Sequence, residues 1–145
     1  MKILAVTGVT FLLIEAIAAS AFGAFAVSAQ EKKEAYVPTA EVKTLLDKPL
    51  PGVEGQQVTV LHGTFPPGWL GGRHYHSGPV YVYVLEGSFT VDEQGKPRQT
   101  ITAGQLYEEP IGTPMQARNV NTSQPLKILL FQVNRHGEPL AYKAD

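Results

Sequence analysis

The sequence predicts an all-β fold, a small sandwich or barrel, for the main part of the chain. Alternating or β-branched runs recur along it, such as QQVTVLHGTF at 56–65 and VYVYVLEG at 80–87. Turn signals separate these runs, and the 145 residues include 14 glycines and 11 prolines. Because proline is disfavoured inside helices, this composition favours strands joined by turns.

Each element follows from its own stretch of sequence. Residues 39–48 predict a helical turn or two, with Thr39 as cap and Pro49 and Pro51 ending it. A hairpin is expected around 93–96, where the sequence reads EQGK. The remaining strands are expected at 56–65, 80–87, 105–110, 115–122 and 126–135.

The first 29 residues differ from the rest and predict a secretory signal peptide. Lys2 gives a positive start, an apolar run follows, and Val27-Ser28-Ala29 suits cleavage after Ala29. An uncleaved anchor is the alternative, but the charged Glu15 within the run opposes stable insertion in a bilayer. We therefore expect a periplasmic or secreted protein, with an N-terminal arm at 30–54 and a barrel domain at 55–145.

Composition excludes several classes of function. The chain has no cysteine, so disulfides, thiolate catalysis and cysteine-ligated metal centres are ruled out. Its formal net charge of -1 and the lack of a basic stripe argue against nucleic-acid binding. After cleavage we expect no membrane attachment.

Two motifs carry most of the functional information. In the first, Gly68 is followed by five residues, the pair His74 and His76, and later Gly87. In the second, Gly104, Pro110, Gly112 and Asn119 stand at fixed spacings around position 115. This frame resembles the two motifs of the cupins over about residues 55–134. The resemblance implies a double-stranded β-helix, or jelly-roll barrel, with a metal or a small ligand inside.

The chain departs from the cupin pattern at two of the four ligand positions. Val80, or Tyr81 if the gap is counted one longer, stands where the family has its glutamate, and Met115 stands where it has its last histidine. His74 and His76 are two apart, so on a strand both point to one face. A small barrel has room for one metal or ligand there.

Three interpretations of the two histidines remain open. The first is a remodelled metal site of His74, His76 and Met115, binding a divalent or copper ion; a thioether favours copper. The second is a metal-free pocket in which the histidines bind a small polar ligand or act as acid and base. In the third, they are ordinary interior residues of a scaffold.

Other residues are weaker candidates. His62 and Glu86 are expected at strand ends in solvent, and His136 in a solvated turn. Of Glu108 and Glu109, at most one points inward, because adjacent strand residues face opposite ways. Two further expectations concern aromatic residues: Trp69 near the barrel mouth, and a homodimer built on an outward aromatic row of Tyr75, Tyr81 and Tyr83.

The sequence thus predicts an exported barrel protein that binds a metal ion or small molecule through His74 and His76. The alternatives are a metal-dependent isomerase, lyase or dioxygenase with a non-standard third ligand, and a metal-free scaffold. Fold alone does not decide among them.

Overall fold

The computed structural model describes residues 33–145, and the predicted signal peptide at 1–29 lies outside them. This part of the chain forms strands and no helix. The strands are β1 Glu41–Pro49, β2 Gln56–Phe65, β3 His74–Tyr75, β4 Val80–Glu86, β5 Ser88–Glu93, β6 Gln99–Thr102, β7 Leu106–Glu109, β8 Met115–Arg118, β9 Leu126–Arg135 and β10 Tyr142–Lys143. Among these residues, none belongs to a helix that could cross a membrane.

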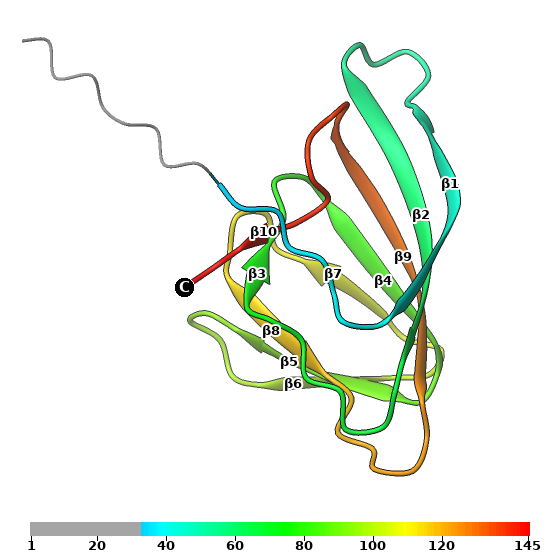
Figure 1. Cartoon of the computed structure of the whole chain (residues 1–145), viewed down its shortest axis with the longest axis vertical. Coiled ribbons are helices and arrows are strands. Elements are labelled where there is room, and N and C mark those ends of the chain that lie inside the picture. The colour runs from blue at the N-terminus through cyan, green and yellow to red at the C-terminus, as the bar shows by residue number, and fades with distance from the viewer. Residues whose placement is uncertain (1–32) are drawn as a thin grey trace, which may run out of the picture. The chain divides into compact units, whose positions relative to one another are not determined.

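The strands form two five-stranded sheets, in the orders β1-β2-β9-β4-β7 and β10-β3-β8-β5-β6 (Figure 1). Neighbouring strands in both sheets run antiparallel. The all-β prediction is confirmed, and the strands expected at 56–65, 80–87, 105–110 and 126–135 all form.

The helical turn predicted over 39–48 is wrong, because residues 41–49 form strand β1. This strand pairs with β2 from Glu41↔Thr64 to Pro49↔Gln57, with an irregularity between Thr44 and Leu46. Nearly all of its residues are exposed, as in an edge strand. Backbone pairing with the long strand β2 satisfies the N–H and C=O groups on the side of β1 that faces β2, and this outweighs the weak helical preference of the segment.

The interior follows the predicted alternation. Val80, Val82 and Val84 on β4 are at most 2 % exposed, whereas Tyr81 and Tyr83 between them point outward. From the facing sheet, Val91 and Met115 are fully buried against them. The core therefore lies between the two sheets, as expected for alternating strands with one buried face.

Asn119 of the second motif organises a turn rather than a reactive site. Its side-chain amide donates hydrogen bonds to the carbonyls of Phe65, Pro66 and Gln124. Its Oδ1 accepts a hydrogen bond from the Asn121 backbone N–H. The residue is 1 % exposed and ties two loops together.

The predicted aromatic row on the outer surface is only partly formed. Tyr81 and Tyr83 face outward on β4, and Phe131 is the cross-strand partner of Tyr81 on β9. Tyr75 belongs to the other sheet and stacks on Tyr142, with 5.5 Å between ring centroids. The homodimer expected from this row stays a prediction, which light scattering would test.

Candidate metal centre

Two histidines on one short segment form the base of the site. His74 lies on β3 and His76 just beyond its end, and they are 7 % and 4 % exposed. Their ring centroids are 5.2 Å apart and the rings are nearly perpendicular. The prediction that both point into the barrel is therefore confirmed, as the period of two along a strand requires.

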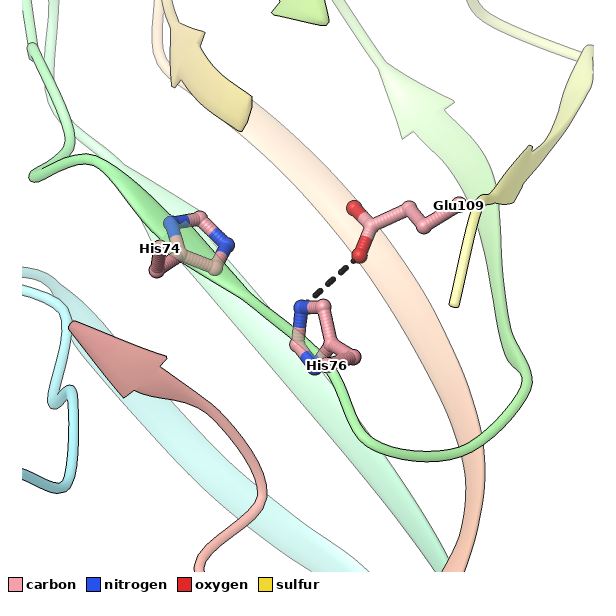
Figure 2. Close-up of side chains that lie close together, drawn as sticks. All are labelled: His74, His76 and Glu109. Carbon is pink, nitrogen blue, oxygen red and sulfur yellow. Dashed lines mark ion pairs between the residues drawn. The ribbon is translucent and has the colours of Figure 1, made fainter. Parts of the chain in front are cut away.

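A carboxylate from the other sheet completes the cluster. Glu109 ends β7, is 6 % exposed, and places its Oε2 2.9 Å from His76 Nε2 (Figure 2). One ligand atom from each of His74, His76 and Glu109 lies within 4.8 Å of the other two. This buried group can hold a metal ion.

Glu109 occupies the place of the missing family glutamate, but from the adjacent strand. Val80 and Glu109 are direct partners across β4 and β7. Directly opposed residues in an antiparallel pair project to the same face, with Cβ atoms about 4.5–5.5 Å apart. The carboxylate therefore reaches the interior at the level of Val80.

A bridge between the residues that follow β3 and β7 explains why His76 and Glu109 meet. His76 forms an isolated parallel bridge with Ile111, two residues after Glu109. The Gly112 N–H donates a 2.8 Å hydrogen bond to the His76 carbonyl, and Gly112 has a φ of 71°. Glycine adopts this left-handed conformation without strain, so the turn after Pro110 brings the two segments together.

Backbone carbonyls fix the orientation of both imidazoles. Nδ1 of His74 lies 2.9 Å from the Gly72 carbonyl, and Nδ1 of His76 lies 2.7 Å from the Leu140 carbonyl. Since a carbonyl only accepts, each Nδ1 carries a proton. In the neutral rings Nε2 is then the free donor atom, the arrangement typical of metal-ligating histidines.

The contact between His76 and Glu109 needs a positive charge. With Nδ1 protonated, a neutral His76 would direct its Nε2 lone pair at a carboxylate oxygen 2.9 Å away. Glu109 Oε2 is also buried without a hydrogen-bond partner, because the close approach does not have the alignment of a hydrogen bond. A proton on Nε2 or a metal cation between the two atoms resolves the repulsion.

The two histidines differ in their pKa values. Burial lowers the pKa of His74, and its hydrogen bond to Gly72 only partly offsets this. For His76, burial also acts to lower the pKa, but pairing with Glu109, with help from Leu140 and Gln132, raises it overall. Without a metal, His76 therefore binds a proton more readily than His74.

Segments near both ends of the described chain cover the histidines. The Tyr36 ring lies parallel to the His74 ring, with centroids 4.3 Å apart and planes 5° from parallel. The Gly72 N–H donates to the Tyr36 hydroxyl at 3.1 Å, and a Cβ on Gly72 would lie 2.8 Å from the Tyr36 ring. Tyr36 is itself held by a backbone hydrogen bond to the Ala141 carbonyl.

The residues fit a divalent metal ion. Three atoms within 4.8 Å of one another all lie within about 2.8 Å of a common centre, close to ligand distances of roughly 2.0–2.2 Å. Two imidazoles and one carboxylate are the same ligand types as in the facial triad of non-haem iron proteins, so an ion held by these three residues would keep coordination positions for other ligands. A bound ion would also satisfy the orphaned Oε2 of Glu109.

The other predicted candidates lie apart from this cluster or play packing roles. Met115 is the cross-strand partner of His74 but is fully buried in the apolar core, and its role as a ligand stays a prediction. Glu86 is exposed and pairs with Lys127 at 2.9 Å, and His136 is exposed beside Gln57. Trp69 is buried and lines the cavity next to the site.

Sequence reasoning missed Glu109 as the carboxylate of the site. Strand alternation showed only that at most one of Glu108 and Glu109 would face inward, and Glu109 does. The cross-strand register of Glu109 with Val80 identifies its position, and that register depends on the folded sheet.

Comparison with known proteins agrees with the fold and with the motif frame. The family model of the Cupin domain matches residues 61–131, which include His74, His76, Glu109 and Met115. The chain belongs to the cupin superfamily. No curated protein matches the sequence significantly.

Several solved structures are similar in fold. The DMSP lyase DddQ from Ruegeria pomeroyi is 17 % identical with a TM-score of 0.56, over 68 % of this chain and 49 % of that one. This chain thus spans about half of that lyase. An RmlC-like cupin from Methanocaldococcus jannaschii, described as a double-stranded β-helix, is 18 % identical with a TM-score of 0.56, covering 68 % and 84 % of the two chains. KdgF from Halomonas sp. is 22 % identical with a TM-score of 0.53, covering 67 % and 81 %.

These similarities establish the fold of this cupin. Its chemistry has to be argued from its own residues. The double-stranded β-helix predicted from the motif frame is confirmed. Within the cupin frame, this chain keeps the two histidines of the first motif and replaces the glutamate of that motif by Val80. Its carboxylate comes from Glu109, within the second motif.

Proposed function

We propose that this cupin binds one divalent metal ion through His74, His76 and Glu109, and uses it to bind a small molecule in the barrel. The observation that carries the proposal is the buried His-His-Glu cluster, with both Nδ1 atoms anchored and Glu109 Oε2 unsatisfied. A buried carboxylate beside two fixed imidazoles favours Fe(II), Mn(II) or Zn(II) over the copper ion that a Met115 site would favour.

The residues contribute definite properties to such a site. His74 and His76 would present Nε2, oriented by Gly72 and Leu140. Glu109 would supply the negative charge that offsets part of the charge of the ion. When bound, the ion supplies a Lewis acid with coordination positions open to an incoming oxygen or nitrogen atom.

A metal-dependent enzyme is the second candidate function. It is favoured by the cavity of about 900 Å³ that His74, His76 and Glu109 line, which gives a substrate access to the cluster. The DMSP lyase of similar fold is consistent with lyase chemistry on such a barrel, but at 17 % identity it supports the fold alone.

Metal titration of chelator-treated protein tests the proposal. Fe(II), Mn(II), Zn(II) and Cu(II) would be added separately while thermal unfolding is followed, because a ligand that binds only the native state raises Tm. We expect a saturable rise with at least one of the first three ions, and none in His74→Ala/His76→Ala. A matched control is His62→Ala, whose side chain is absent from the cluster. No rise with any ion would overturn the proposal.

Export is proposed on separate grounds. The positive start, apolar run and VSA site of residues 1–29 support cleavage after Ala29 and a periplasmic or secreted location. N-terminal sequencing of protein from the cell envelope tests this, with Gln30 as the expected first residue. An intact Met1 on membrane-bound protein would contradict it.

A further inference from the structure

The cavity beside the metal cluster has predominantly apolar walls. Its volume is about 900 Å³, in the upper part of the range of roughly 300–1,000 Å³ typical of small-molecule sites. Both sheets contribute apolar side chains to it, including Phe65, Trp69, Phe89, Leu126, Ile128 and Leu130. A ligand that fills this space transfers its own apolar surface out of water.

The charges around the cavity disfavour highly charged ligands. Among the described residues, its lining includes Asp47, Glu109 and Glu138 but neither lysine nor arginine. Recognition of phosphates and multiply charged anions in proteins relies on arginine and lysine side chains. In the proposed centre, the metal ion is then the main group able to attract an anion.

Polar side chains in the lining largely have partners within the protein. Thr59 donates a 3.2 Å hydrogen bond to Asp47 Oδ1, and His136 Nδ1 lies 2.9 Å from Gln57 Oε1. The Gln132 amide donates to the Leu140 carbonyl at 2.6 Å. The Oε1 atom of Gln132 is buried without a partner and is therefore one acceptor open to a ligand. Apart from this atom and the metal cluster, the walls offer few free polar groups to a ligand rich in hydroxyl groups.

We infer that the cavity binds a small molecule with a predominantly apolar body, at most one negative charge and a single oxygen-donor headgroup at the metal. The inference rests on the proposed metal site and names the class of ligand for it. Sugar acids and phosphorylated compounds are excluded from this class, because the walls match neither their hydroxyl groups nor their charge.

A chain-length series of carboxylates tests the inference. Trp69 is the only tryptophan of the chain and lines the cavity, so its fluorescence reports occupancy. Butanoate, hexanoate and octanoate would be titrated into metal-loaded protein expressed from the full-length coding sequence. We expect saturable binding with affinity rising about fourfold per added CH₂, as apolar burial predicts. Gluconate, which carries its carboxylate on a polyhydroxyl body, should bind at least about tenfold more weakly than hexanoate.

Adjacent residues on β9 provide a matched pair of variants. Leu130 lines the cavity, whereas Leu129 alternates to the outer face of the same strand. Leu130→Asn should weaken octanoate binding by at least about tenfold, and Leu129→Asn should leave it within about twofold. Thermal unfolding of both variants would confirm that each is folded.

The outcomes separate this inference from the proposed function. Metal content is measured on the same samples. Bound metal together with a flat chain-length series, or with gluconate binding as tightly as hexanoate, overturns the inference and leaves the metal site intact. Absence of metal overturns the proposed function. The apolar part of the inference is then tested with butanol, hexanol and octanol, and it is overturned if their affinity does not rise with chain length.

Discussion

Glu109 is expected to contribute a large part of the metal affinity through its negative charge. Glu109→Gln keeps the shape of the side chain and removes the charge. Two unit charges about 4 Å apart interact by about 4 kcal/mol at an effective dielectric constant near 20. A divalent ion within the cluster lies closer than this, so Kd should rise by at least about a thousandfold.

The register of β4 and β7 allows the carboxylate to be moved back to the family position. Because Val80 and Glu109 are direct cross-strand partners, Val80→Glu in a Glu109→Val background places a carboxylate on the same face, about 5 Å away. We expect this double variant to bind metal at least about tenfold more tightly than Glu109→Val alone. The neutral double variant Val80→Gln/Glu109→Val is the control, and it should show no recovery.

Competition with a chromophoric chelator measures these affinities directly, with Mn(II) or Zn(II) as the metal. Thermal unfolding of each metal-free variant checks that the fold persists. The reasoning is refuted if folded Glu109→Gln binds the metal within about threefold of wild type. That result would mean that Met115 or a water molecule, and not Glu109, is the third ligand.

Three further predictions follow from the geometry around the cluster. Met115→Leu should leave metal affinity unchanged. Because it conserves apolar volume, it should also lower the free energy of unfolding by less than about 1.5 kcal/mol. Loss of metal binding in this variant would show that Met115 is a ligand. Tyr36→Ala removes the ring stacked on His74 and should weaken metal binding about 10–100-fold, as for other groups that orient a ligand. Tyr36→Phe keeps the stacked ring and should have a smaller effect. If a chelator competition gives Tyr36→Ala the same metal affinity as wild type, Tyr36 does not orient His74. The raised pKa of His76 stabilises the metal-free protein fully below the unfolded pKa near 6.5, and this stability is lost as pH rises through the folded pKa. Chelator-treated protein should therefore lose Tm between neutral and alkaline pH, while Glu109→Gln should lose much less over the same interval.

Much of the barrel could be predicted because its strands carry their own local pattern. Alternation in VYVYVLE predicts which side of β4 is buried, and Val80, Val82 and Val84 follow it. Glycines with positive φ, such as Gly87 and Gly112, mark turns that the motif spacing had already indicated. β1 could not be predicted in the same way, because its exposed residues carry no alternation of burial and its conformation is set by pairing with β2.

The candidate site was only half predictable, since its residues differ in what brings them together. His74 and His76 are two apart on one segment, so local geometry places both on one face. Glu109 joins them through the bridge of His76 with Ile111 and the pairing of β7 with β4, contacts between segments far apart in sequence. Tyr36 reaches His74 through the same kind of long-range contact, and no local pattern in its own stretch indicates this.

Metal content of the purified protein tests the central claim most directly. The protein would be purified without chelators or metal-affinity resin, and its metals counted by inductively coupled plasma mass spectrometry beside His74→Ala/His76→Ala and Glu109→Gln. The account predicts about one iron, manganese or zinc ion per wild-type chain, and little metal in either variant. It is contradicted if the wild type is metal-free and also fails to take up these ions, or if the folded variants retain the same metal as wild type.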